Sequence, residues 1–189
     1  MDRREALKHT AIILGAVSAS SVMAVMSGCK AGKTRDWTPV VLTEGKADLV
    51  AAISERIIPK SETPGAMDAE VDAFIDMVLN GYVEEKEKQA FLAGLADVEA
   101  RAQSKHQDAF VDLTAEQQDA ILTELANETE ELAFPERAKA FFPKIKELTI
   151  TGYFTSELVA EKHLHYQPVP GDYLGCVDID EVGNLVYAE

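Results

Sequence analysis

The residues Thr151–Val177 have the sequence TGYFTSELVAEKHLHYQPVPGDYLGCV, and the character of the chain changes there. They include four of the twelve aromatic residues that are Phe or Tyr (seven Phe and five Tyr) and two of the seven prolines. The sequence before them is rich in Ala, Glu and Lys, whereas this mixture of aromatic residues, Pro and Gly favours an irregular segment. We therefore expect the segment to lie over a surface, either of the same chain or of a partner.

Upstream of this segment, apolar residues recur at spacings of three and four, which predicts amphipathic helices. Start and stop signals delimit about five of them. The expected helices are Lys46–Ile58 between Thr43 and Pro59; a second from an Asp68 cap to a left-handed cap at Asn80-Gly81; Val83–Lys105; a fourth opened by a capping box at Thr114; and a fifth from Pro135 to Ile150 with a kink at Pro143.

Alternating apolar residues occur only near the C-terminus, from Leu174 to Tyr187, where Gly183-Asn184 has the residues of a hairpin turn. The predicted fold class is therefore mainly α. We expect a small helical domain of about five helices with an irregular C-terminal extension and a short terminal hairpin.

An arginine pair precedes an apolar segment at the N-terminus. Arg3 and Arg4, with Leu7 and Lys8 after them, are followed by the run from Ala11 to Met26, which is apolar but diluted by Gly and Ser. This pattern is typical of a twin-arginine export signal. The run is also shorter than the about 20 residues that a membrane-spanning helix needs.

The sequence Met26-Ser27-Gly28-Cys29 resembles a bacterial lipobox, in which small residues precede a cysteine that becomes lipidated. Leu is the usual residue at the position of Met26, so cleavage by an ordinary peptidase stays an alternative. If Cys29 is lipidated, its acyl chains tether the mature protein to the periplasmic side of a bacterial membrane without spanning it. Lys30, in place of Asp, weakly favours the outer membrane.

The chain after the leader has the size of one domain. About 160 residues remain, which is enough for a modest core. We expect residues 1–28 to be the signal peptide and residues 29–45 to be a lipidated tether with Trp37 as its one anchor. The helical domain would then occupy residues 46–178, followed by a tail over 179–189.

Composition limits the ligands of this chain. Its formal net charge of −15 excludes nucleic acid as a partner, because phosphate binding needs patches rich in Lys and Arg. The chain has no Gly-rich phosphate loop, no CxxC pair and no HExxH sequence. We therefore predict no cofactor and no metal in this chain. Since twin-arginine export moves folded proteins, the signal raises the question of what else is exported.

The residues that come closest to an enzyme site are Ser156 and Glu157 with His163 and His165. Two histidines at i, i+2 can share a metal on an extended segment, but two ligands make a weak site. Surface histidines are the plainer interpretation. The hydroxyl groups of Thr155 and Ser156 are expected to bond local backbone.

Cys176 is the only cysteine that remains if Cys29 is lipidated. In an oxidising compartment, an odd cysteine indicates either a disulfide to another chain or a buried free thiol. Both alternatives stay open at this point.

Two sequence blocks resemble the gluconate 2-dehydrogenase subunit 3 family. Ile57–Ala66, IIPKSETPGA, followed by Phe74-Ile75-Asp76, is similar to the family pattern IPxTDTPGA…FID. Gly152–Glu157, GYFTSE, followed by Tyr166–Cys176, YQPVPGDYLGC, resembles the C-terminal signature of the family. Lys60-Ser61-Glu62 departs from the common Thr-Asp-Thr, which bears on partner preference more than on membership.

The resemblance implies an accessory role. Family members are small, cofactor-free subunits of membrane-associated dehydrogenases, paired with a large FAD flavoprotein of the glucose-methanol-choline oxidoreductase type and often with a multihaem cytochrome c. The small subunit is thought to stabilise the flavoprotein and to carry it through twin-arginine export, which would explain the leader. This chain would then be a non-catalytic subunit. The alternative is a stand-alone exported lipoprotein that acts as a scaffold or binding module.

The partner interface is expected in the C-terminal segment. Large aromatic residues dominate interfaces, and prolines hold a segment extended, which lowers the entropy lost on docking. The predicted interface residues are Tyr153, Phe154, Glu157, Tyr166, Pro168, Pro170, Tyr173 and Cys176.

Overall fold

The computed structural model describes residues 35–164, Cys176 and Asp178. These residues form seven α-helices and one 3-10 helix, with no strand among them, so the prediction of a mainly α fold is confirmed. The elements are α2 (Glu44–Ile57), α3 (Val71–Gly81), α4 (Glu85–His106), the 3-10 helix η1 (Phe110–Asp112), α5 (Ala115–Glu130), α6 (Glu136–Lys139), α7 (Phe141–Thr155) and α8 (Glu157–Lys162).

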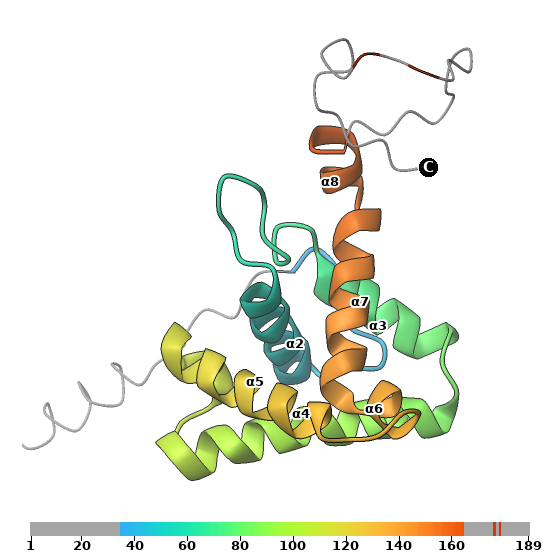
Figure 1. Cartoon of the computed structure of the whole chain (residues 1–189). Helices are drawn as coiled ribbons and strands as arrows, with labels where there is room; N and C mark the ends of the chain where they lie inside the picture. Colours follow the sequence, from blue (N-terminus) through green and yellow to red (C-terminus); the bar gives the residue numbers. More distant parts are fainter. Residues whose placement is uncertain (1–34, 165–175, 177, 179–189) are drawn as a thin grey trace, which may run out of the picture. The chain divides into compact units, whose positions relative to one another are not determined.

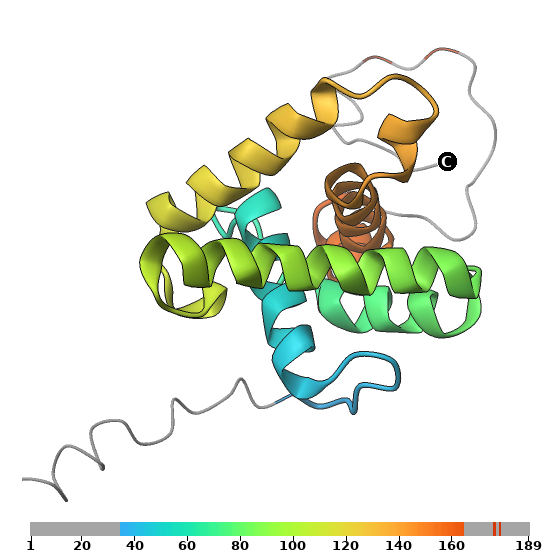
Figure 2. The same cartoon turned by 90° about the horizontal axis from the view of Figure 1, so that it is seen from below.

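Helix α7 is the element around which the others pack. It contacts α2, α3, α4 and α5, and Figure 1 shows it beside α2 and α3, with α4 crossing below. In the view from below in Figure 2, α7 is seen nearly end-on behind α4. Because α2 and α3 come from the first half of the fold, this packing brings the two sequence blocks close together.

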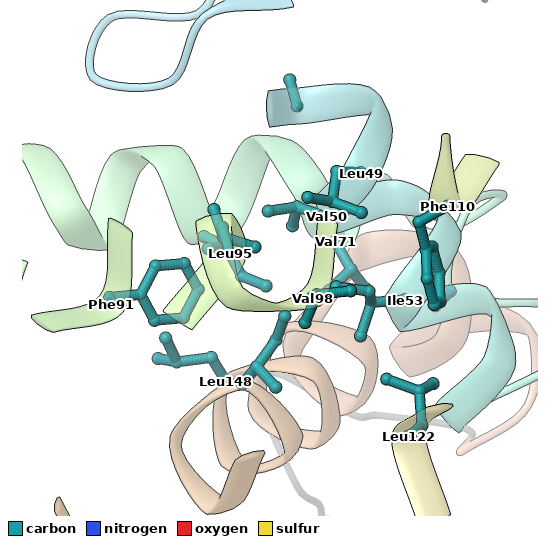
Figure 3. Packing of buried hydrophobic residues seen from close by; sticks show 14 of the residues in the cluster. Leu49, Val50, Ile53, Val71, Phe91, Leu95, Val98, Phe110, Leu122 and Leu148 are labelled. Atoms are coloured by element: carbon teal, nitrogen blue, oxygen red, sulfur yellow. The ribbon is translucent and has the colours of Figure 1, made fainter. Parts of the chain in front are cut away.

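The core consists of the apolar stripes that the helical spacing predicts. Ile53, Leu95 and Ile145 are fully buried, and the labelled side chains in Figure 3 show how α2, α4 and α7 contribute to one cluster. Each fully buried side chain of this size stabilises the fold by about 1.5–3 kcal/mol. Phe110 of η1 is also fully buried, although no periodic pattern surrounds it.

Two predicted helix starts are confirmed. The hydroxyl of Thr43 accepts a hydrogen bond from the Lys46 amide at 3.4 Å, so α2 begins at Glu44. At α5, Thr114 and Gln117 form the complete capping box: the Gln117 amide donates to the Thr114 hydroxyl, and the Thr114 amide donates to the Gln117 side chain. Each cap satisfies amides that the first turn of a helix leaves without a partner.

The segment before α2 belongs to the fold. The carboxylate of Asp76 in α3 accepts hydrogen bonds from the backbone amides of Val40, Val41 and Leu42, at 2.8, 3.0 and 2.7 Å. Trp37 packs against the core as well, as predicted for the anchor. The expectation of a tether as far as residue 45 is therefore wrong for its last residues, because a buried carboxylate fixes their backbone.

The start of α3 differs from the prediction. Glu70, not Asp68, is the N-cap, and it adopts a left-handed conformation at φ 51°. Asp68 instead accepts from the Gly65 amide at 3.1 Å, so its carboxylate serves the preceding loop. Gly81 is the last residue of the helix, and Tyr82 follows at φ −124°, so the predicted left-handed end is also wrong.

The predicted fifth helix is two helices. The chain breaks at Ala140, which has extended backbone at ψ 154° and separates α6 from α7. Pro143 is the third residue of α7, where its missing amide costs no helical hydrogen bond, so it causes no kink. A helix continued through position 139 would have placed the proline ring against the carbonyl of that residue.

The irregular extension begins later than predicted. Helix α7 continues to Thr155, and α8 follows after a single cap residue, Ser156. The Ser156 hydroxyl accepts from the Val159 amide at 3.3 Å, and Val159 is buried. The predicted hairpin over 174–187 lies outside the described residues apart from Cys176 and Asp178.

Candidate partner-binding surface

The first sequence block forms a loop with a fixed base. We call Pro59–Ala66 the motif loop. Glu55, in the last turn of α2, accepts hydrogen bonds from the backbone amides of Lys60 and Met67, both at 2.9 Å. One carboxylate thus holds both ends of the loop, while residues 59–63 at its tip are exposed.

Gly65 allows the close approach of these two ends. A Cβ atom at this position would lie 2.5 Å from Oε1 of Glu55 and 2.7 Å from the Lys60 amide nitrogen. Both distances are shorter than van der Waals contact, so a side chain here would displace the carboxylate from the loop. The glycine of this block therefore has a structural reason.

The second block contacts the first. The hydroxyl of Tyr153, near the end of α7, donates a hydrogen bond to the carbonyl of Pro64 at 2.8 Å. Gly152 faces α3: a Cβ atom there would lie 2.7 Å from Cδ1 of Phe74. The residues on which the resemblance rests therefore meet at one end of α7, although 89 positions separate Tyr153 from Pro64.

An aromatic side chain is exposed at this meeting point. The Phe154 side chain is 49% exposed, and its ring lies 5.3 Å from the Tyr153 ring in an edge-to-face arrangement. Ile150, one turn earlier on α7, is 39% exposed. Tyr153 is itself only 6% exposed, so it supports the motif loop from inside and does not itself form the outer surface.

The residues after Phe154 hold the chain in position. The Thr155 hydroxyl donates to the Thr151 carbonyl and the Ser156 hydroxyl donates to the Tyr153 carbonyl, both at 2.7 Å, as expected for hydroxyls that bond local backbone. Glu157 is exposed in the first turn of α8, where a negative charge is favourable.

We call Pro59–Thr63, Ile150, Phe154 and Glu157 the candidate surface.

An ion pair fixes the helix that leads into the motif loop. Arg56 of α2 donates two hydrogen bonds, each of 2.7 Å, to the carboxylate of Asp119 in α5. These hydrogen bonds hold the pKa of Asp119 below its usual value and raise the pKa of Arg56. The pair is partly exposed, so it orients the end of α2 more than it stabilises the fold.

The remaining predicted residues have different positions. Cys176 is a free and exposed thiol, so burial of this thiol in its own chain is wrong, and a disulfide to a partner stays a prediction. His163 is exposed at the end of α8. The other predicted residues lie outside the described part of the chain: Arg3, Arg4, Leu7, Lys8, Cys29, His165, Tyr166, Pro168, Pro170 and Tyr173.

Two features are absent from the part of the chain that the structure describes. No group of three His, Cys, Asp or Glu side chains within residues 35–164 and positions 176 and 178 is arranged to hold a metal ion. None of the helices in that same part is both long enough and apolar enough to cross a bilayer.

The sequence analysis missed two carboxylates that fix the backbone: Glu55 holds the motif loop, and Asp76 holds residues 40–42. Asp76 is the last residue of the Phe74-Ile75-Asp76 block, and an aspartate within an otherwise buried helical stripe is a signal that could have been found. Glu55 lies one turn before the motif loop and has no such signal, because its partners are backbone amides that the fold alone brings near.

We expect Tyr153→Phe to lower the free energy of unfolding by about 1 kcal/mol, because it leaves the Pro64 carbonyl without its hydrogen bond. Urea denaturation followed by circular dichroism measures this change. Tyr82→Phe is the matched control, since the Tyr82 side chain is 77% exposed. Equal midpoints for the two variants would contradict the role of the Tyr153 hydroxyl.

Comparison with known proteins identifies one family. A family model described as Gluconate 2-dehydrogenase subunit 3 matches residues 44–171, which is more than half of the 189-residue chain and includes both sequence blocks up to Gly171. No curated protein and no solved structure gives a significant match.

Proposed function

The chain belongs to the gluconate 2-dehydrogenase subunit 3 family, and from this membership we propose that it is the accessory small subunit of an FAD-dependent sugar or polyol dehydrogenase. Its partner is a large flavoprotein of the glucose-methanol-choline oxidoreductase type, joined in some complexes by a multihaem cytochrome c. The chain binds and stabilises the flavoprotein, which carries the FAD and performs the oxidation. The chain itself has no cofactor and no catalytic role.

The observation that supports this proposal best is the convergence of the two sequence blocks. The Tyr153 hydroxyl on the Pro64 carbonyl joins them into one rigid base, and the exposed residues of that base are a loop tip and a large aromatic side chain. A preorganised loop loses little entropy on docking, and exposed aromatic residues are common binding anchors. Such a surface suits the binding of a folded protein.

The predicted leader supports a second proposed role for this subunit, in export. We propose that Arg3 and Arg4 direct export of the chain together with the folded, FAD-loaded partner. After export, acyl chains on Cys29 hold the complex on the periplasmic side of the membrane, with the outer membrane weakly favoured by Lys30. Mass spectrometry of the native N-terminus tests this anchor: an acylated Cys29 is expected, and a mature chain that begins elsewhere without lipid would contradict it.

We expect Phe154→Ala to weaken capture of the flavoprotein by about 30-fold, because a buried interface anchor contributes about 2 kcal/mol. Affinity capture of the flavoprotein on the full chain, with bound flavin read by absorbance, measures this loss. The matched control is Tyr82→Ala, which removes an exposed aromatic ring outside the candidate surface.

Point substitutions are required here, because truncation after Ile150 would also remove the buried Tyr153 and Val159 from the core. Equal capture by both variants would place the interface elsewhere. If even the unmodified chain captures no flavoprotein, the chain is a scaffold without a dehydrogenase partner.

A further inference from the structure

Two hydroxyl groups face each other in the core, where α2 packs against α7 (Figure 1). Ser54 of α2 and Thr149 of α7 are both fully buried, and their side-chain oxygens lie 3.1 Å apart, so one hydroxyl donates a hydrogen bond to the other. Ile53 and Ile145, on the same two helices, are fully buried as well. The pair is therefore a polar contact between two helices inside an apolar environment.

Other buried polar side chains bond to nearby backbone instead. Gln118 donates to the Phe110 carbonyl at 2.8 Å, and Thr129 donates to the Leu125 carbonyl of its own helix at 2.7 Å. Ser54 and Thr149, in contrast, are 95 positions apart. Their hydrogen bond forms only when two helices that are distant in the sequence lie against each other in one arrangement.

Stability alone does not explain this hydroxyl pair. Folding exchanges hydrogen bonds to water for this one, and replacing both partners by apolar groups of the same shape is nearly neutral. Separating the two hydroxyls inside the core is costly, because each one then lacks both water and a partner. The pair therefore disfavours every arrangement of the two helices in which the hydroxyls do not meet.

A shift of α7 along α2 is such an arrangement. Residues four positions apart lie on the same face of a helix, so a shift by one turn, about 5.4 Å, would place Ile145 or Tyr153 opposite Ser54 in place of Thr149. Apolar contacts are non-directional and oppose this shift only through shape. The hydroxyl pair opposes it through the cost of two buried hydroxyls without partners.

The hydroxyl pair is adjacent to the residues that hold the motif loop. Ser54 directly precedes Glu55, which accepts hydrogen bonds from both ends of the loop. Thr149 lies one turn before Tyr153, whose hydroxyl donates to a carbonyl of the same loop. The tip of the motif loop follows α2, whereas Phe154 belongs to α7. The spacing between these two parts of the candidate surface therefore depends on how α7 lies on α2.

We propose that Ser54 and Thr149 are positioning residues that fix α7 in register with α2 and so set the geometry of the candidate surface for its protein partner. Both residues are fully buried, so neither contacts the partner. The effect on the partner rests on the proposed function, whereas the register is a property of this chain alone. Two measurements separate these effects.

A double-mutant cycle on the full chain tests the register. The apolar variant, Ser54→Ala with Thr149→Val, removes both hydroxyls and keeps nearly the same volume, so its midpoint of urea denaturation should stay close to that of the wild type. In the wild type, Tyr153→Phe lowers the midpoint because the Pro64 carbonyl loses its hydrogen bond. In the apolar variant, α7 no longer holds the Tyr153 hydroxyl at that carbonyl. Tyr153→Phe should then have less than about half of this effect.

Thr129→Val is the matched control, because it removes a buried hydroxyl that bonds to its own helix. Tyr153→Phe should lower the midpoint by the full amount in this background. The swapped variant, Ser54→Thr with Thr149→Ser, keeps a hydroxyl on each helix and should also show the full effect. If the apolar variant does not fold, Ser54→Ala alone takes its place in the cycle, since it removes a single oxygen atom.

Affinity capture of the flavoprotein measures the effect on the partner. We expect the apolar variant to weaken capture by about tenfold, because a surface that must be ordered on binding loses affinity. The swapped variant and Thr129→Val should capture as well as the wild type.

An equal effect of Tyr153→Phe in all backgrounds would overturn the proposed register role, whatever the capture shows. A reduced effect of Tyr153→Phe with unchanged capture would overturn the consequence for the partner. If the wild-type chain itself captures no flavoprotein, the proposed function fails, and the double-mutant cycle still decides the register.

Discussion

Asp76→Ala is expected to lower the free energy of unfolding by about 3 kcal/mol or more. The Asp76 carboxylate is 3% exposed and accepts hydrogen bonds from the three successive amides of Val40, Val41 and Leu42. Hydrogen bonds to a charged group contribute about 1.5–3 kcal/mol each, and amides left without an acceptor cost further free energy. The loss should also release the segment from residue 37 to residue 42.

Urea denaturation gives the stability change, and hydrogen exchange of the Val40 and Leu42 amides shows whether the segment is released. Asp76→Asn keeps one acceptor oxygen and should fall between the wild type and Asp76→Ala. Glu161→Ala, at an exposed position of α8, is the control for loss of a carboxylate. An Asp76→Ala variant that is no less stable than the control would contradict this role of the Asp76 carboxylate.

The clamp holds residues 40–42 on the helix that also packs against the end of α7. Asp76 lies on α3 two residues after Phe74, and Phe74 packs against Gly152 at the end of α7. Residues 40–42 are therefore fixed to α3, the helix whose Phe74 lies against the end of α7.

Local patterns in the sequence predict the elements whose causes are local. The caps at Thr43 and Thr114 depend on residues three positions apart, and the buried stripes depend on helical spacing. The break at Ala140 could not be predicted in this way. A proline at position 143 is compatible either with a kink in one long helix or with the first turn of a new helix. Only the packing of Phe141 against Phe91 and Gly94 distinguishes them: the Phe141 and Phe91 rings lie 5.3 Å apart.

Contacts between distant residues could not be predicted from the pattern. Tyr153 and Phe154 are adjacent aromatic residues of one block, and the sequence assigns both to an interface. The structure separates them, because helical geometry turns Tyr153 toward the Pro64 carbonyl and leaves Phe154 in solvent. The hydrogen bonds that Asp76 and Glu55 accept from backbone amides could not be predicted either, because only the fold brings those amides near.

Changing both Arg3 and Arg4 to lysine should abolish dehydrogenase activity at the periplasmic membrane. Lysine keeps the charge but loses the planar guanidinium group, and a receptor that reads an arginine pair distinguishes the two. If this chain carries the flavoprotein through export, the double substitution should retain both proteins in the cytoplasm. The flavoprotein would then depend on the export signal of this chain. Lys33→Arg, a Lys/Arg exchange outside the pair, should leave export unchanged.

The location of the flavin tests the carrier and subunit roles together. Cells with the wild-type chain and cells with the Arg3→Lys, Arg4→Lys chain are fractionated, and protein-bound FAD and dehydrogenase activity are measured in cytoplasm and periplasmic membrane. We predict that flavin and activity move from the membrane to the cytoplasm together with this chain, and that they co-purify with it from both locations. A flavoprotein that reaches the periplasm while this chain stays in the cytoplasm would contradict the account.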